Sequence, residues 1–586
     1  MNKILSLLIL ASISLLTACS VRNGVYTVEL CATNDLHGRY FDSLYVEKAV
    51  HPHSLANVSE YVNQLRKSNG NGGVLLVDLG DAVQGDNASF YSNFIDTADH
   101  TKKHLFTRVA EYIGYDALVV GNHDIEAGHS VYDKICKETK IPYLAANAID
   151  VNTGKSYFKP YAIFNKNGLK IAVIGMTNPN IKKWLGEELW YGMDFIGIEE
   201  KAQELINSLK ANENPDIIVL AIHAGIGSGK DTDIENPARY LAAKLDGVDV
   251  VLAAHDHRTA CEKVASIHPN RDSVLVFDGS NRAKFIAQAT IKCEFKEGKL
   301  VSKNITGSLV PMDQIPVDTA YTNAFREDFL VTKEFTNQEI GVLEKQIRTS
   351  DAFFGMSEYM NLIHTIQLSL SGASVSLAAP LTFNGTVNAG TLKYNDLFTL
   401  YPFENQLYVV NLTGEQIKKY LEFSYDLWIN TMKSQSDHIL KIRYNPSRSG
   451  YSFVNASYNF DSAAGLNYTV DVTKPYGERI SILSFADGSP YQMENTYKVA
   501  MSSYRANGGG DILTQGVGFS KESLESIVVE KQKDIRSLIY DYYKNSSSSD
   551  NNTPVGLQNV NIGEWKFVPQ SMVIPAMERD SKLLLN

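Results

Sequence analysis

The sequence is poor in cysteine and has no long apolar run after its first 20 residues, and each shortage excludes a class of protein. Only five of the 586 residues are cysteine, and no two of them form a Cys-x-x-Cys pair. So few cysteines in so long a chain exclude a disulfide-built scaffold. No later stretch is long and apolar enough to cross a bilayer, so we expect no membrane-spanning helix there.

The sequence also lacks an excess of basic residues. It has 55 Lys and Arg against 66 Asp and Glu, which gives a formal net charge of −11. An acidic surface repels polyanions, so we expect no duplex nucleic acid among its partners. A small phosphate ester remains compatible with this charge, because metal ions at a site outweigh distant surface charge.

The first 19 residues have the features of an export signal. Lys3 precedes an apolar run that ends at Leu16, and Thr17, Ala18 and Cys19 follow. Such a segment predicts a secretory signal, and Leu-Thr-Ala-Cys resembles the bacterial lipobox, in which the cysteine is lipidated. We therefore expect a membrane anchor on Cys19 and a place in the cell envelope, in the periplasm or at the outer membrane or cell surface. The alternative is a plain signal peptide cut elsewhere.

Two domains are expected from the length and from the order of patterns along the chain. In residues 25–315, short apolar runs alternate with amphipathic segments, which is typical of a layered α/β domain. Residues 316–348 are polar with scattered apolar positions and predict a helical linker or one long helix. Residues 349–545 mix strand-like and helical segments, as in an α+β domain. Residues 546–586 begin as a Ser-rich linker and continue as a tail, in which Trp565 and Phe567 are expected to pack on the body.

Candidate metal ligands follow five of the apolar runs in the first domain. In open α/β sheets, ligands bind outside the carboxyl ends of the strands, so these side chains should converge there. Imidazole together with carboxylate oxygen suits zinc or manganese. The candidate ligands are Asp35, His37, Asp81, Asn122, His223, His255 and His257.

This set of motifs resembles the calcineurin-like metallophosphoesterases over residues 25 to about 290. The motifs are Asp35-x-His37, Gly80-Asp81, Gly121-Asn122-His123-Asp124, His223 and His255-x-His257. The resemblance implies a four-layer α/β/β/α fold and two divalent metal ions as cofactors, with Asp81 bridging them. Asp35, His37 and His257 would complete one site, and Asn122, His223 and His255 the other.

The resemblance also implies a catalytic role for His123, which would stabilise the developing charge or protonate the leaving group. Glu126 lies three residues further on and is positioned to orient the His123 imidazole. The alternative is that Glu126 only caps a helix, in which case His123 keeps its role with a less fixed tautomer.

The second half resembles the substrate domain of the 5'-nucleotidase and 2',3'-cyclic-nucleotide phosphodiesterase superfamily. The matching segments are residues 397–406, 412–414, 458–465 and 504–511. In that family two aromatic side chains stack on the nucleobase, and by motif position these would be Phe460 and Tyr504. Each could instead be a core aromatic. The polar neighbours Asn459, Asp461 and Ser462 favour a loop, and hence a substrate contact, for Phe460.

The substrate branch rests on two departures from classical 5'-nucleotidases. Residues 376–383 contain no arginine where those enzymes carry a phosphate-gripping one, and residues 508–511 read Gly-Gly-Gly-Asp. These departures favour a 2',3'-cyclic-nucleotide phosphodiesterase and 3'-nucleotidase that works by metal-activated water. The alternative is a 5'-nucleotidase, because residues 401–405 resemble the corresponding segment of those enzymes.

Two readings from other classes remain open at this point. A catalytically silent nucleotide-binding lipoprotein would be favoured by the loss of a ligand or of His123, yet all are present. An adhesion module with structural zinc would use a closed, cysteine-rich site, and these candidate ligands include no cysteine. We therefore expect a monomeric enzyme with a nucleotide as its partner.

Overall fold

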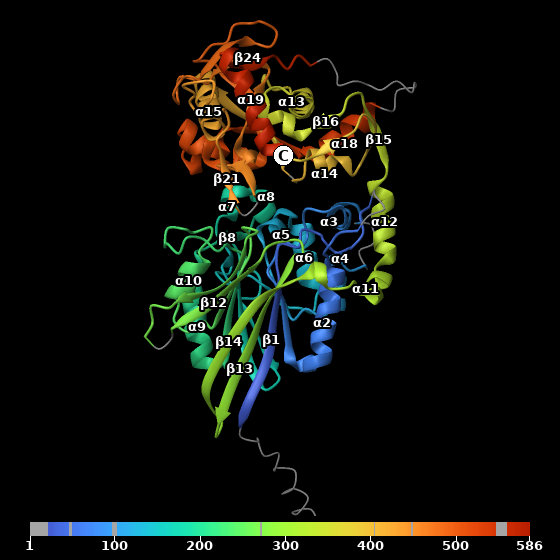
Figure 1. Ribbon diagram of the computed structural model, residues 1–586, viewed down its shortest axis with the longest axis vertical. Helices are drawn as coiled ribbons and strands as arrows, with labels where there is room; N and C mark the ends of the chain where they lie inside the picture. The colour runs from blue at the N-terminus through green and yellow to red at the C-terminus, as the bar shows by residue number, and fades with distance from the viewer. Residues whose placement is uncertain are drawn as a thin grey trace, which may run out of the picture.

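The computed structural model describes residues 22–45, 50–96, 102–269, 272–403, 405–446, 449–546 and 560–585. The predicted signal segment with Cys19 lies outside these residues, as does most of the predicted Ser-rich linker. Figure 1 shows two bodies stacked along the long axis, the N-terminal one below and the C-terminal one above. In the described part of the chain, every helix is too short or too polar to cross a bilayer.

The N-terminal body contains two six-stranded sheets. The first has the order β14-β13-β1-β2-β3-β4 and the second β11-β12-β10-β9-β7-β6. The first sheet consists of β1 (Gly24–Thr33), β2 (Val74–Asp78), β3 (Ala117–Val119), β4 (Tyr143–Leu144), β13 (Phe285–Lys296) and β14 (Lys299–Pro311). The second consists of β6 (Tyr161–Lys166), β7 (Leu169–Met176), β9 (Ile217–Ile222), β10 (Val250–Ala253), β11 (Thr259–Ala265) and β12 (Ser273–Gly279).

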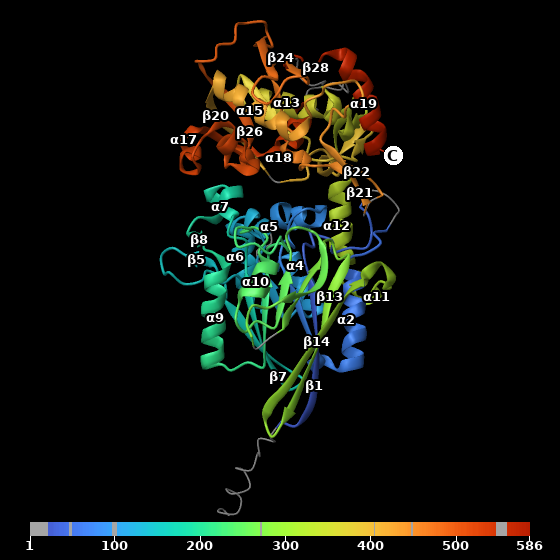
Figure 2. The ribbon, with the colours of Figure 1, turned by 60° about the vertical axis from the view of Figure 1, so that its left-hand side comes forward.

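The two sheets pack face to face between two layers of helices. Buried side chains such as Leu75 of the first sheet and Val219 of the second meet in one apolar core between the sheets. Helices α2 (Leu55–Asn69), α4 (Leu105–Ile113) and α6 (His129–Glu138) cover the outer face of the first sheet. Helices α9 (Ile198–Asn212) and α10 (Ala238–Lys244) cover the second (Figure 2). This arrangement confirms the predicted α/β/β/α layers.

The inner strands of both sheets run parallel, which places their carboxyl ends at one edge of each sheet. β1 pairs in parallel with β2, and β2 with β3. In the second sheet β7, β9, β10 and β12 are parallel neighbours. Their apolar runs are buried on both faces, as expected for parallel strands covered by helices. The carboxyl-end edge faces the C-terminal body in Figure 1.

The connection between the bodies is not one long helix. Helices α11 (Thr319–Ala324) and α12 (Arg326–Thr336) are separated at Phe325, whose backbone leaves the helical region at φ −107° and ψ 15°. Strand β15 (Glu339–Leu343) follows and pairs with β19 (Gly390–Lys393). The end of this polar segment therefore already belongs to a sheet of the C-terminal body.

The C-terminal body is an α+β domain around a five-stranded sheet of order β23-β17-β26-β20-β27. The strands are β17 (Val375–Ala378), β20 (Gln406–Thr413), β23 (Ser462–Ala464), β26 (Thr496–Ser502) and β27 (Val528–Asp534). Helices α13 (Glu358–Ser371) and α15 (Gly414–Trp428) pack against this sheet. The mixture confirms the α+β pattern of the sequence.

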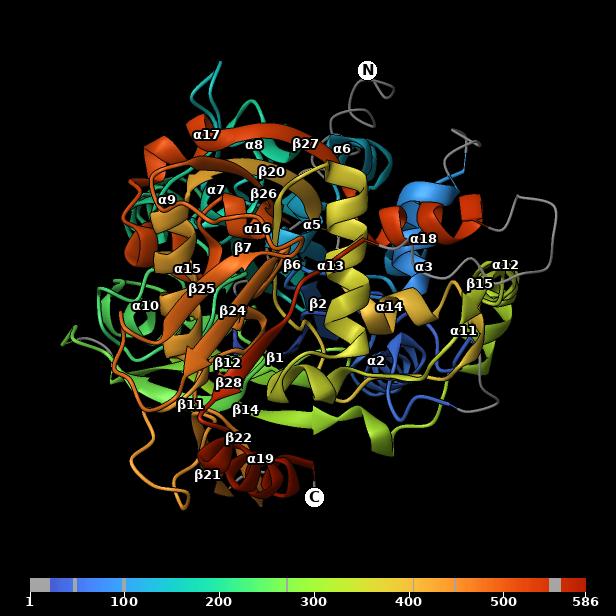
Figure 3. The ribbon, with the colours of Figure 1, turned by 90° about the horizontal axis from the view of Figure 1, so that it is seen from above.

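The tail returns to the C-terminal body. Strand β28 (Trp565–Val568) pairs in parallel with β24 (Leu466–Asp471), and the two lie side by side in Figure 3. The Trp565 ring stacks on Tyr468 with centroids 5.7 Å apart and an interplanar angle of 11°. Helix α19 (Gln570–Leu585) follows the strand and completes the chain.

Candidate metal centre and nucleotide pocket

Seven polar side chains meet at the carboxyl ends of five strands. Asp35 and His37 follow β1, Asp81 follows β2, and Asn122 follows β3. His223 directly follows β9, and His255 and His257 follow β10. Six of these seven side chains form two clusters, each able to hold a metal ion: Asp35, His37 and His257, and Asp81, His223 and His255. The structure thus brings together the ligand set that the sequence predicts.

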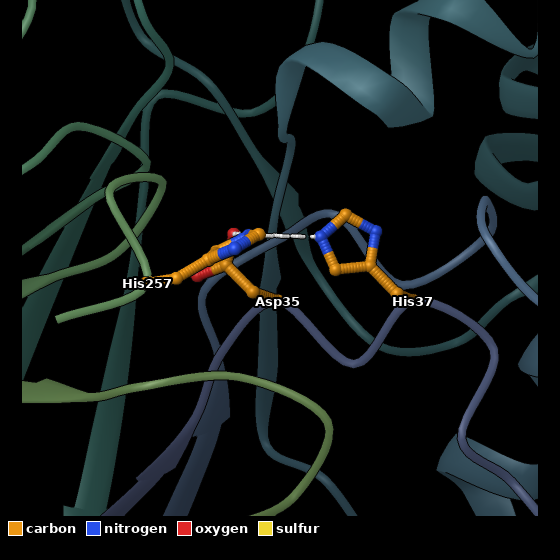
Figure 4. Close-up of side chains that lie close together, drawn as sticks. All are labelled: Asp35, His37 and His257. Atoms are coloured by element: carbon orange, nitrogen blue, oxygen red, sulfur yellow. Dashed lines mark hydrogen bonds and ion pairs between the residues drawn. The ribbon is translucent and has the colours of Figure 1, made fainter. Parts of the chain in front are cut away.

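The first cluster joins one carboxylate to two imidazoles (Figure 4). The Nε2 atoms of His37 and His257 lie 3.0 Å apart, and His257 Nε2 lies 3.3 Å from Asp35 Oδ1. Asp35 is fully buried, and its Oδ1 atom has no hydrogen-bond partner. A buried carboxylate oxygen facing two ring nitrogens is costly unless a cation binds there, so this arrangement fits a metal ion.

The second cluster includes the side-chain oxygen of Asn122. His223 Nε2 lies 3.0 Å from Asp81 Oδ2 and 3.1 Å from Asn122 Oδ1. His255 Nδ1 lies 2.9 Å from the same Asn122 oxygen. Four potential ligand atoms therefore converge on one point, and they include no sulfur, which suits zinc or manganese.

Two backbone carbonyls orient the imidazoles of these clusters. His37 Nδ1 lies 3.1 Å from the Gln84 carbonyl oxygen, and His223 Nδ1 lies 2.8 Å from that of Leu79. A carbonyl only accepts hydrogen bonds, so in each neutral ring the proton sits on Nδ1 and the lone pair on Nε2 faces the cluster. These partners could not be predicted from the sequence, because both are main-chain atoms.

The electrostatic field of the site favours a positive charge. Burial opposes ionisation of Asp35, but the nearby His257 and His223 imidazoles lower the pKa of its carboxyl group to about 2. Burial also disfavours a charged His223, yet the adjacent Asp81 carboxylate raises its pKa to about 9. Against the effect of burial, the His223 and His123 imidazoles likewise hold the pKa of the Asp81 carboxyl group well below its usual range. Both carboxylates therefore stay ionised at neutral pH, as metal ligands must, and a metal ion would displace the proton of His223.

Five of the seven side chains project from residues with a left-handed backbone. Positive φ is uncommon for residues other than glycine and persists where the surrounding structure imposes it, often at functional sites. The five residues are Asp35 (φ 47°), His37 (φ 44°), Asp81 (φ 55°), His255 (φ 79°) and His257 (φ 55°). The sharp turns at the strand ends therefore aim these side chains at a common point.

Asp124 holds two of the ligand loops together. Its carboxylate accepts hydrogen bonds from the backbone N–H groups of Asp81 at 3.0 Å and Gly121 at 2.8 Å. It also accepts one from Ala82 at 3.1 Å. The sequence placed Asp124 within a motif without assigning it a role, because Asp81 and Ala82 lie about 40 residues away at another strand end.

His123 lies on the short helix α5 (Asn122–Glu126) beside the second cluster. Its backbone N–H donates to Asp81 Oδ1 at 2.8 Å. The predicted contact between His123 Nδ1 and the Glu126 carboxylate is present. The His123 side chain is 23% exposed and that of Glu126 only 8%. The imidazole is therefore accessible from the solvent, whereas the carboxylate that contacts it is largely buried.

A cavity of about 480 Å³ lies between the two bodies and joins the clusters to the C-terminal domain. From below it is lined by His123, His255, His257 and Trp184. Trp184 belongs to α7 (Ile181–Trp184), which lies at the top of the N-terminal body in Figure 1. From above the cavity is lined by Leu377, Ala378, Ala379, Tyr458, Tyr504 and Arg505, among others.

Comparison with known families agrees with this two-part site. Residues 29–259 match the calcineurin-like phosphoesterase family, and residues 337–515 match the C-terminal domain of 5'-nucleotidases. The chain carries a calcineurin-like phosphoesterase domain and a 5'-nucleotidase C-terminal domain. It is therefore a hydrolase of the nucleotidase family of phosphoesterases.

Curated relatives of this phosphoesterase include proteins named as a nucleotide phosphoesterase and as a 5'-nucleotidase. The trifunctional nucleotide phosphoesterase YfkN of Bacillus subtilis is 26% identical over 88% of this chain, which spans only 38% of YfkN. Protein UshA of Yersinia enterocolitica is 26% identical over 68% of this chain and 76% of its own length. A 5'-nucleotidase of Vibrio parahaemolyticus is also 26% identical, over 68% of this chain and 74% of its own.

Solved structures share the fold of this phosphoesterase over nearly its whole length. A Staphylococcus aureus protein described as a 5'-nucleotidase aligns with a TM-score of 0.73 at 18% identity, covering 92% of this chain and 100% of its own. A 5'-nucleotidase precursor of Thermus thermophilus aligns with a TM-score of 0.60 at 20% identity, covering 93% and 100%. At these identities the likeness shows the fold alone.

The structure differs from the sequence expectation at Phe460. This side chain is fully buried and stacks on Trp428, with centroids 5.7 Å apart and an interplanar angle of 3°. Its polar neighbours were misleading, because Asp461 is itself buried in an ion pair with Arg505 at 2.7 Å. Phe460 is therefore a core residue and not a substrate contact. Tyr458 lies two residues earlier, is 44% exposed and lines the cavity.

Proposed function

We propose that this phosphoesterase uses two divalent metal ions to release phosphate from nucleoside 5'-phosphates. The observation that carries the proposal is the single cavity that joins two His/Asp clusters and His123 to exposed aromatic side chains of the C-terminal domain. The names of the relatives support the 5'-nucleotidase reading over the cyclic branch that residues 376–383 favoured in the sequence.

Each cluster would hold one metal ion. Asp35, His37 and His257 form the first set of ligands, Asn122, His223 and His255 the second, and Asp81 would bridge the two ions. Zinc or manganese bound there would polarise the phosphoryl oxygen and supply a water of lowered pKa. The buried, ionised carboxylates and the imidazole lone pairs on Nε2 give these ions a preorganised site.

His123 is the group that we assign to proton transfer. Glu126 accepts the Nδ1–H of His123 and thereby fixes the orientation of the imidazole. The ring then presents Nε2 to the ester, where it donates a proton or a hydrogen bond to the leaving oxygen. The Asp81 carboxylate accepts the backbone N–H of His123. This bond fixes the position of the proton donor relative to the bridging ligand.

Tyr458 and Tyr504 are the residues that we assign to the nucleobase. Both line the cavity, and their rings meet edge to face with centroids 6.4 Å apart and an interplanar angle of 84°. Stacking on an aromatic face accepts any base, so we expect low base specificity.

Tyr458→Ala should raise KM, because one stacking contact is worth about 1–3 kcal/mol, or about 5- to 150-fold. Tyr458→Phe keeps the ring and should stay close to the wild-type KM. Phe460→Ala serves as the contrasting core variant: it should lower the free energy of unfolding by about 3–5 kcal/mol and leave KM of the folded enzyme unchanged. Steady-state kinetics and denaturant unfolding measure the two effects. A normal KM in Tyr458→Ala would remove Tyr458 from the base site.

A second candidate, the hydrolysis of 2',3'-cyclic and 3'-nucleotides, is favoured by the charge of the cavity. Among the described residues that line it, Arg505 is the only lysine or arginine, and its charge is already paired with Asp461. Leu377, Ala378 and Ala379 occupy the segment in which an arginine would grip a phosphate dianion. A cyclic diester carries one negative charge and depends less on such a grip.

The two candidates are separated by the hydrolysis of 5'-AMP, 3'-AMP and 2',3'-cyclic AMP, followed as phosphate release from the two monoesters and as ring opening to a nucleoside monophosphate for the cyclic diester. The chain lacking residues 1–19 would be assayed with manganese or zinc. We expect kcat/KM for 5'-AMP to be the highest of the three, by about tenfold or more, which corresponds to about 1.4 kcal/mol. Higher values for the 3' and cyclic substrates would establish the second candidate. Hydrolysis of none of the three would overturn both.

A further inference from the structure

His255 differs from the other ligand histidines in what holds its ring. The Nδ1 atoms of His37 and His223 lie against backbone carbonyls, and their Nε2 atoms face the clusters. In His255 the arrangement is reversed: Nδ1 faces Asn122 Oδ1 at 2.9 Å, and Nε2 lies 3.2 Å from Oε1 of Glu235. The outer nitrogen of this ring is therefore held by a carboxylate and not by the main chain.

The backbone of Glu235 is fixed from two sides. Its carbonyl oxygen accepts hydrogen bonds from Asn178 Nδ2 at 3.0 Å and from the Gly225 N–H at 3.3 Å. The neighbouring Asp233 carboxylate accepts the backbone N–H groups of Ser228 and Asn236 at 3.1 and 3.2 Å and closes the loop on itself. The Glu235 side chain is thus presented to His255 by a loop with a defined shape.

Glu235 also belongs to the substrate cavity. It lines the cavity together with His255, Tyr458 and Tyr504. Burial raises the pKa of Tyr504 to about 12, and the Glu235 carboxylate adds to that rise. The Glu235 carboxylate therefore lies on the same cavity wall as both the metal cluster and the aromatic pair.

We propose that Glu235 is a positioning residue that accepts the Nε2–H of His255, fixes its tautomer with the lone pair on Nδ1, and strengthens metal binding at the second cluster. A carboxylate that accepts the outer N–H of a ligand histidine orients the ring and raises its basicity. Trp184 supports the same ring from its face, since the two rings stack with centroids 5.2 Å apart at 17°. This inference rests on the proposed metal site.

The first test is a calorimetric titration of the metal-free protein with Mn²⁺. The wild type should bind two ions. In Glu235→Ala, one of the two sites should lose about 10- to 100-fold in affinity while the other is unchanged. Glu235→Gln keeps the Oε1 acceptor without its charge and should recover part of the loss. Asp231→Ala removes an exposed carboxylate from the same loop and should bind both ions like the wild type.

Trp184 provides a second, local readout that does not depend on activity. Because its ring stacks on His255, metal binding at the second cluster should change its fluorescence, and Trp184→Phe should remove that change. The midpoint of the fluorescence change should move to higher Mn²⁺ concentration in Glu235→Ala by the same factor as in calorimetry. A global loss of structure would instead lower the thermal unfolding midpoint, and Glu235→Gln would then carry the test.

Three outcomes are distinguishable. Weakening of one site with partial rescue by glutamine supports the role of Glu235. Two ions bound with wild-type affinity in Glu235→Ala, together with an unchanged fluorescence midpoint, overturn it and leave the proposed function intact. A wild-type protein that binds fewer than two ions would contradict the proposed function itself.

Discussion

Asp81→Asn should lose more than about a thousandfold in kcat/KM for every nucleotide substrate. Asp81 is fully buried between the clusters, with Oδ2 3.0 Å from His223 Nε2 and Oδ1 accepting the His123 N–H. Asparagine keeps the size and one acceptor but removes the negative charge that would bridge two ions. Metal ions contribute several kcal/mol to the stabilisation of transition-state charge, and each 1.4 kcal/mol lost is a factor of ten in rate.

The cause of this loss can be checked by metal analysis. We expect Asp81→Asn to bind at most one ion per chain, and the wild type two. Asp313→Asn is a matched control, because Asp313 is an exposed aspartate of the same domain outside the cavity. It should retain full activity and both ions. If Asp81→Asn kept two ions and more than about a tenth of the activity, Asp81 would not be the bridging ligand.

His123→Ala should lower kcat by about 10²- to 10⁴-fold, or about 3–5 kcal/mol, without loss of metal. The side chain lines the cavity and contacts Glu126, whereas its link to Asp81 runs through the backbone N–H and survives the substitution. The variant therefore separates proton transfer from metal binding, which Asp81→Asn cannot do.

The leaving group provides the sharper test of this role. p-Nitrophenyl phosphate is a monoester like 5'-AMP, but its leaving oxygen needs little protonation, so His123→Ala should slow its hydrolysis far less than that of 5'-AMP. Glu126→Gln should reduce the rate less than His123→Ala, because the imidazole remains. His268→Ala, at a histidine outside the cavity, is the control. Equal losses with both leaving groups would argue against proton donation and leave charge stabilisation as the role of His123.

The sequence was sufficient to predict the fold class and to indicate which polar side chains meet at the strand ends. The apolar runs of the first half form strands, and these strands are buried on both faces because each sheet lies between the other sheet and a layer of helices. Asp35, Asp81 and His223 each stand at or just beyond the end of such a run. Parallel strands place these ends at one edge, so position along the chain alone already indicates proximity in space.

The sequence was insufficient where a side chain is placed by distant partners. Phe460 and Tyr458 are two residues apart, yet one fills the core against Trp428 and the other lines the cavity. The polar residues next to Phe460 led to the wrong prediction of the substrate-facing aromatic residue, because Asp461 is buried beside Arg505 and not exposed. Packing against a helix more than 30 residues away settled which aromatic residue faces the substrate.

The sequence by itself determined the chemistry of the centre: which strand ends carry imidazole and carboxylate groups, and that a second domain of α+β type follows. These properties are local, since a residue's type and its place at the end of an apolar run do not depend on the rest of the fold. Only the tertiary structure decided which nitrogen of His255 faces the cluster, and that Glu235 and Trp184 hold its ring. Those contacts join loops that are 20 or more residues apart, and their geometry exists only once the two sheets of the N-terminal body have packed.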